Sequence, residues 1–156
     1  MTLSELCLEC GLCCDGTLFR HVEISSSERE RLVQLGIKVG ERRKHDVMWL
    51  PCGKLEGRKC TIYEQRPGGC DRFVCALGRK LKANEVGGDE ALARVREMQA
   101  ALDALRALLP PGEGPVLRRA RELIDAPQPV TDDLLAAFKR VDTIRYEVFM
   151  PPPQPE

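Results

Sequence analysis

The sequence has 156 residues and a formal net charge of zero, because 24 acidic residues balance 24 basic ones. This length accommodates one domain or a small module with an extension, and the balanced charge disfavours nucleic acid and anionic membranes as partners. No stretch reaches the ~20 apolar residues of a membrane-spanning helix, and the first residues lack the features of a secretory signal, so we expect a cytoplasmic protein.

The distribution of cysteine divides the chain. All eight cysteines lie in the first 75 residues, and none follows. We therefore predict a mostly α fold with a small irregular α+β cysteine-rich lobe, and with C-terminal helices packed on or beside it. The predicted parts are a metal-binding module at residues 1–82, a helical region at 83–150 and a Pro-rich tail at 151–156.

The predicted elements of the lobe are short. An extended piece near residue 22 precedes a helix that ends at Gly36, and its start carries a capping box, either Ser25 with Glu28 or Ser27 with Glu30. The sequence DVMWL predicts a strand that Pro51 ends. Residues 52–75 are rich in Gly, Pro and Cys, which predicts turns, with one strand start after residue 60 and a turn at residues 67–69.

Three helices are predicted beyond Gly88. Apolar residues at a 4-3 spacing predict an amphipathic helix over residues 89–109, and these residues are Ala91, Val95, Met98, Leu102, Leu105 and Leu109. A second helix is predicted over 115–125 and a third over 132–147, the third capped by Thr131. The predicted apolar face of the third helix consists of Leu134, Leu135, Phe138, Val141, Ile144 and Val148.

The cysteine spacing indicates metal ligation. The pattern is C-x2-C-x2-C-C, then 37 residues, then C-x7-C-x9-C-x4-C. A C-x2-C interval brings two sulfurs onto one ion, and a reducing compartment disfavours disulfides. The predicted metal ligands are Cys7, Cys10, Cys13, Cys14, Cys52, Cys60, Cys70 and Cys75. They could fill two four-thiolate sites, or one site with four cysteines left over, and the adjacent Cys13 and Cys14 suggest that the ligands divide there.

The metal is either zinc or iron, the latter possibly as a 4Fe–4S cluster. The opening differs from the bacterial C-x2-C-x2-C-x3-C iron–sulfur pattern, and the second half lacks the paired C-x2-C of a zinc ribbon. The stretch from Cys52 to Lys82 contains eight basic residues and only three acidic ones. This excess suits an anionic thiolate centre of either kind, and Arg66 and Arg72 are candidates for N–H···S contacts.

The motif CLECGLCCDG, followed by TIYEQRP, GGC and DRF up to Cys75, resembles the CxxCxxCC family of cysteine-cluster proteins, a YkgJ-type zinc- or iron-chelating domain. The resemblance covers all eight cysteines together with Tyr63, Arg66-Pro67 and Phe73. A basic residue usual beside the seventh cysteine is displaced here by Asp71. The resemblance implies metal binding in the cytoplasm, and some relatives resemble flagellin lysine N-methylases.

We expect the metal to be mainly structural and the lobe to fold on loading it, because its hydrophobic content is low. Two alternatives stay open. One is an iron–sulfur enzyme, either an oxidoreductase or a methyl-transfer accessory, and the other is a metal chaperone or redox sensor. No hydrolase motif or phosphate loop is present in the sequence, and His21 and His45 lack ligand spacing to a cysteine. Catalysis and a protein partner are left undecided.

Overall fold

A computed structural model describes residues 1–150, so the predicted tail at 151–156 lies outside the described residues. This part of the chain is mostly α-helical with two small antiparallel sheets. The α-helices are α1 (Leu3–Cys10), α2 (Ser26–Gln34), α3 (Gly68–Arg72), α4 (Ala76–Lys82), α5 (Gly88–Ala107), α6 (Val116–Asp125) and α7 (Asp132–Ile144). The strands are β1 (His21–Glu23), β2 (Val39–Arg42), β3 (His45–Trp49), β4 (Leu55–Glu56) and β5 (Lys59–Cys60). A 3-10 turn covers Tyr63–Gln65, and a π-helical turn covers Arg145–Phe149.

The chain forms two compact units. One is Cys7–Val74, and the other joins Met1–Leu6 to the chain from Cys75 onward. Among the helices of the described chain, none has both the length and the apolar character needed to cross a bilayer.

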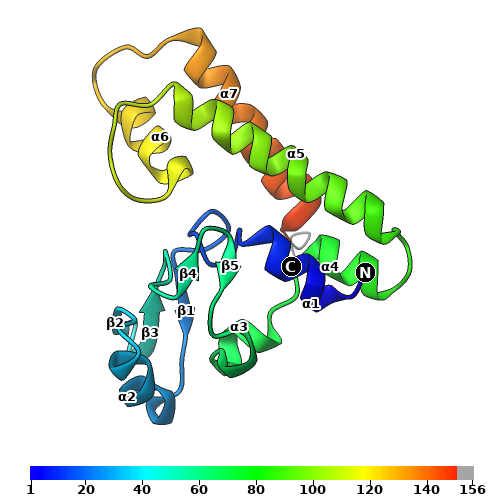
Figure 1. Ribbon diagram of the computed structural model, residues 1–156. Helices are drawn as coiled ribbons and strands as arrows, with labels where there is room; N and C mark the ends of the chain where they lie inside the picture. Colours follow the sequence, from blue (N-terminus) through cyan, green and yellow to red (C-terminus); the bar gives the residue numbers. More distant parts are fainter. Residues whose placement is uncertain (151–156) are drawn as a thin grey trace, which may run out of the picture. The chain divides into compact units, whose positions relative to one another are not determined.

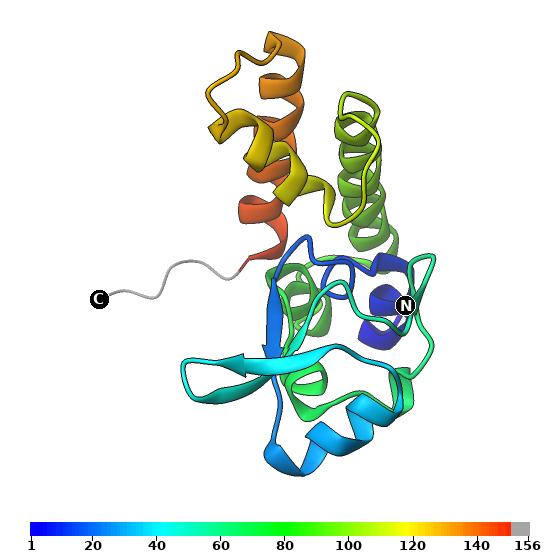
Figure 2. The same ribbon diagram turned by 90° about the vertical axis from the view of Figure 1, so that its left-hand side faces the viewer.

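Helices α5, α6 and α7 pack on one another in the second of these units, and α5 and α7 lie side by side in both views (Figures 1 and 2). The 4-3 spacing predicted the buried stripe of α5 correctly. Thr131 caps α7, because its hydroxyl accepts a hydrogen bond from the Leu134 amide at 3.1 Å. The predicted apolar face of α7 is wrong at Leu135, which is 41% exposed. The π-helical turn shifts the register after Ile144 and buries Phe149 instead.

Helix α1 was not predicted, although its start carries a readable signal. The Thr2 hydroxyl accepts a hydrogen bond from the Glu5 amide at 3.2 Å, and the Glu5 carboxylate accepts one from the Thr2 amide at 2.6 Å. This reciprocal pair is a capping box, and it places Cys7 and Cys10 on a helix rather than in an irregular turn.

The unit Cys7–Val74 contains a three-stranded sheet in the order β1-β3-β2, on which α2 packs (Figure 2). The register places His21 opposite Trp49 and Val39 opposite Met48. Because side chains alternate along a strand, Met48 faces the core cluster with Val22 and Val39. The buried residues of this cluster are Ile24, Leu32, Ile37, Met48, Leu50 and Cys52.

The stretch after Pro51 is more regular than predicted. Strands β4 and β5 form a small hairpin that turns at Gly57, where φ is +60°. The expected turn at residues 67–69 is instead the start of a helix, because Pro67 stands at the N-cap of α3 and the Asp71 amide donates to the Pro67 carbonyl at 3.0 Å. Proline is well suited to a helix start, since it has no N–H that would go unpaired there.

Candidate metal centre

Cys14 and Cys52 are brought together by the main chain, although 37 residues separate them. The Cys52 amide donates a hydrogen bond to the Cys14 carbonyl at 2.8 Å. A second main-chain bond closes the same segment, because the Leu50 amide donates to the Arg20 carbonyl at 3.0 Å. The two cysteines therefore lie at the two ends of the segment that carries α2 and the three-stranded sheet, where these bonds hold the ends together.

The β4–β5 hairpin returns Cys60 toward Cys52. The Leu55 amide donates to the Cys52 carbonyl at 3.1 Å, and Leu55 pairs with Cys60 across the hairpin. The Lys54 amide lies 3.5 Å from the Cys52 sulfur and donates to it. Such N–H···S contacts stabilise a thiolate, so the hairpin both positions Cys60 and supports Cys52.

The N-terminal cysteine loop packs closely on the same hairpin at Gly11, the first residue after α1. Its φ is +69°, and a Cβ added there would lie 2.6 Å from the Arg58 carbonyl oxygen. A side chain at this position would therefore meet both an unfavourable backbone conformation and a backbone atom. Glycine permits the approach of the cysteine-bearing turn to the hairpin.

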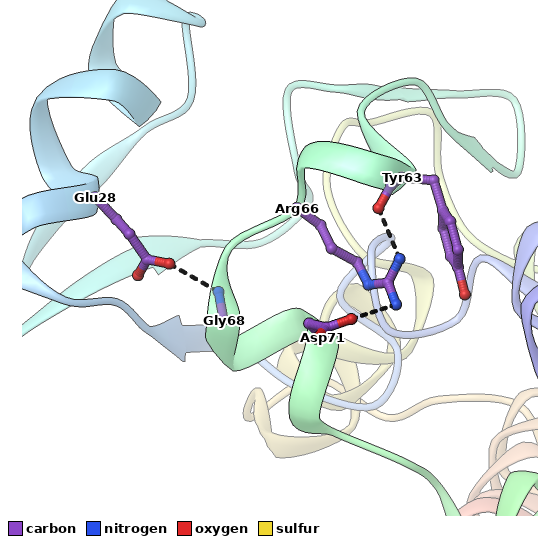
Figure 3. Close-up of polar contacts among 5 residues, drawn as sticks. All are labelled: Glu28, Tyr63, Arg66, Gly68 and Asp71. Atoms are coloured by element: carbon purple, nitrogen blue, oxygen red, sulfur yellow. Dashed lines mark hydrogen bonds and ion pairs between the residues drawn. The ribbon is translucent and has the colours of Figure 1, made fainter.

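Cys70 lies in α3. We call the segment that contains it, residues 63–72, the Cys70 strap. The Glu28 carboxylate of α2 accepts a hydrogen bond from the Gly68 amide at 2.8 Å (Figure 3). Within the strap, the Arg66 guanidinium donates to the Tyr63 carbonyl and to the Asp71 carboxylate, both at 2.6 Å, and lies 3.9 Å from the centre of the Tyr63 ring. Arg66 thus braces the strap internally, a role that the predicted contact to sulfur did not include.

Four thiols, which we call the four-thiol cluster, influence one another electrostatically: Cys14, Cys52, Cys60 and Cys70. Burial raises the pKa of Cys14 to about 12, and the neighbouring Cys60, Cys70 and Cys52 contribute to the shift. Burial also raises the pKa of Cys70 to about 11, with Cys52 and Cys60 adding and Arg66 opposing. The pKa of Cys52 is raised chiefly by burial, against the lowering effect of the Lys54 amide.

The other predicted ligands are placed differently. Cys7 and Cys10 are three residues apart on α1, and Cys13 lies in the turn that follows. Cys75 belongs to the other unit, where its sulfur caps α4 by accepting from the Gly78 amide at 3.3 Å. His21 Nε2 lies 3.2 Å from Arg42 Nη1. Burial lowers the pKa of His21, and the charge of Arg42 lowers it further. His45 is exposed on β3.

The chemistry of the four-thiol cluster fits zinc or an iron–sulfur centre, both of which favour sets of four thiolates. A cation would offset the burial and the mutual repulsion that disfavour ionised sulfur here. Within residues 1–150, no three Cys, His, Asp or Glu side chains already stand in an arrangement that would hold a metal ion.

A comparison with known families agrees with the chemistry of the cysteines. The model of the CxxCxxCC family, described as "Putative zinc- or iron-chelating domain", matches residues 6–91, more than half of the chain. The chain belongs to this family. The CxxCxxCC match contains all eight cysteines and also α4. No curated protein and no solved structure matches the chain.

The raised thiol pKa values predict that the metal-free protein is sensitive to alkali. In the unfolded chain the thiols ionise near their ordinary value of 9.0, whereas Cys14 and Cys70 in the folded chain hold their protons to about 12 and about 11. The stability they contribute is fully present below about pH 9 and is lost as the pH rises toward these values. We expect the thermal midpoint to fall between about pH 8 and about pH 10.5 by less in Cys14→Ser than in the metal-free wild type. Equal falls would contradict the prediction.

Proposed function

We propose that this CxxCxxCC protein binds a metal ion through cysteine thiolates and that the metal is mainly structural. The observation that carries the proposal is the four-thiol cluster, whose sulfurs come from three separate segments of the chain and lie near enough to influence one another's pKa. Zinc is our first choice of ion, held in a closed all-thiolate site with no open position. An iron–sulfur cluster is the alternative.

The charge around the cluster supports this proposal. Four thiolates on one Zn²⁺ leave a net charge of −2, which needs nearby positive groups and N–H donors. The Lys54 amide donates to the Cys52 sulfur, and the Arg66 guanidinium lowers the pKa of Cys70. A reducing compartment such as the cytoplasm, which we infer as the location, would keep the sulfurs available.

The remaining cysteines, which are Cys7, Cys10, Cys13 and Cys75, stay candidate ligands. Cys7 and Cys10 stand on one side of α1 because residues three apart are neighbours on a helix. They would supply further thiolates to any second ion. The four-thiol cluster is the group in which a first ion is expected, because Cys14, Cys52 and Cys70 all pack against the hydrophobic core.

The test is to purify the full-length protein without oxygen and to measure its visible spectrum, its metals and its acid-labile sulfide. We expect a colourless protein that retains zinc after dialysis, because a closed thiolate site releases zinc slowly. A brown protein with iron and sulfide would replace zinc by an iron–sulfur cluster. A folded, colourless protein without metal, which also takes up none from added zinc, would refute metal binding.

A further inference from the structure

We propose that Glu28 is a positioning residue that holds the Cys70 strap in place, so that the rate at which Cys70 leaves the four-thiol cluster depends on this carboxylate. The part of the proposal that concerns metal release rests on the proposed function. The part that concerns access to Cys70 does not need a metal.

Cys70 is fixed differently from the other members of the cluster. A main-chain hydrogen bond joins Cys52 to Cys14, and the hairpin whose Leu55 amide bonds the Cys52 carbonyl also carries Cys60. Cys70 instead stands on the short helix α3, which lies against β1. The strap is tied to α2 by side-chain contacts, and such contacts are broken more easily than a ladder of main-chain bonds. We infer that Cys70 is the member of the cluster that detaches first.

Each of the two oxygens of the Glu28 carboxylate accepts one hydrogen bond. One oxygen accepts from the Ser25 amide at 2.8 Å and completes the start of α2, and the other accepts from the Gly68 amide, 40 residues away, at 2.8 Å (Figure 3). These two bonds lower the pKa of Glu28, the Gly68 bond more than the Ser25 bond. A carboxylate can accept both bonds, whereas a glutamine amide has a single acceptor oxygen.

Helix α2 is a firm support for this contact. Leu32 of α2 is fully buried in the core cluster, and Arg29 forms an ion pair with Asp46 of β3. A second anchor lies one turn further along α2, where Arg31 donates to the Gln65 carbonyl at 2.8 Å. Both anchors therefore connect the strap to an element that the sheet already holds, and opening the strap requires the Glu28 bond to break.

The first measurement is the release of zinc from the loaded full-length protein to a chelator. We expect Glu28→Gln to release zinc roughly 10- to 100-fold faster than the wild type, the range usual when a residue that orients a ligand is lost. Ser25→Ala weakens the start of α2 but leaves the Glu28 carboxylate and the Ser25 amide, and Glu30→Gln changes an exposed carboxylate of the same helix. Both controls should stay within about twofold of the wild type. Release as fast in Ser25→Ala as in Glu28→Gln would overturn the proposal, because it would trace the effect to helix stability.

The second measurement uses the metal-free protein and follows the alkylation of each cysteine by iodoacetamide with mass spectrometry. Glu28→Gln should speed the alkylation of Cys70 about tenfold or more at equal thiolate fraction, which is compared because the Glu28 charge itself raises the pKa of Cys70, while that of Cys52 stays unchanged. Arg31→Gln, which removes the second anchor, should act in the same direction and serves if Glu28→Gln does not fold. Equal acceleration at both cysteines, or none at Cys70, would overturn the inference. A folded wild type that contains no metal and takes up no zinc would refute the proposed function, and the alkylation result would still decide the role of Glu28.

Discussion

Replacing Cys52 with serine is expected to weaken zinc binding about a hundredfold. Structural zinc bound by four ligands is worth roughly 10–16 kcal/mol, so one ligand contributes about 3 kcal/mol, and each 1.4 kcal/mol is tenfold in affinity. Cys52 is the member of the four-thiol cluster that is buried in the core, and its sulfur accepts the Lys54 amide. The measurement is competition with a chelator of known zinc affinity.

Leu50→Ala is the matched control for this substitution. Leu50 is 7% exposed in the same core cluster, so its truncation should cost about 2–5 kcal/mol of stability without removing a sulfur. We expect Leu50→Ala to lower the thermal midpoint while the folded protein keeps its zinc affinity within a few-fold. If both variants show the same loss of zinc affinity at a temperature where both are folded, Cys52 is not a ligand.

Replacing Gly69 with alanine is expected to destabilise the unit Cys7–Val74 by about 1–3 kcal/mol, the usual cost of overpacking. A Cβ at this position would lie 2.4 Å from the Glu23 carbonyl oxygen and 2.7 Å from Val22 Cγ1. Glu23 is held in β1 by its pairing with Val47. The strap would have to move away from the sheet, and chemical denaturation should show the loss.

The neighbouring glycine supplies the comparison. A Cβ at Gly68 would meet the far end of the flexible Arg72 side chain at 2.7 Å and Glu28 Oε1 at an ordinary 3.5 Å. Arg72 can turn aside, so Gly68→Ala should change stability by less than about 1 kcal/mol. A Gly68→Ala variant as unstable as Gly69→Ala would show that helix α3, rather than its contact with β1, determines the effect.

Local signals in the sequence predicted the helices α2, α5, α6 and α7. The 4-3 spacing from Ala91 to Leu105 gives the buried stripe of α5, and Thr131 caps α7 as predicted. The pairing of Ser25 with Glu28 also formed, and it decided between the two proposed capping boxes. In each case the residues that interact are three or four positions apart, which is the distance over which a sequence pattern carries information about a helix.

Contacts across long stretches of chain could not be predicted. The sequence singled out the eight cysteines, but the grouping of Cys14 with Cys52 depends on one main-chain bond that no pattern encodes. Nothing near Gly68 in the sequence indicates that its amide reaches Glu28. The burial of Phe149 depends on a π-helical turn, which breaks the 3.6-residue period on which the predicted face of α7 relied.

The core of the unit Cys7–Val74 bears on the expected coupling between folding and metal. The sequence predicts a lobe with little hydrophobic content, yet Leu32, Ile37 and Met48 are almost completely buried in the cluster that α2 and the sheet form. Such a core stabilises a fold by itself. We therefore expect α2 and the three-stranded sheet to persist without metal, and the ordering that depends on metal to concentrate around the hairpin and the Cys70 strap.

The main-chain bond between Cys52 and Cys14 also means that the folded chain holds its sulfurs at a high effective concentration. Closing a flexible loop of this length costs entropy that grows with the logarithm of the number of residues. Here the sheet and α2 close the loop whether or not a metal is bound. Two separate peptides carrying the same cysteines would lack this advantage, because their binding of a shared ion would depend on the concentration of each peptide in solution.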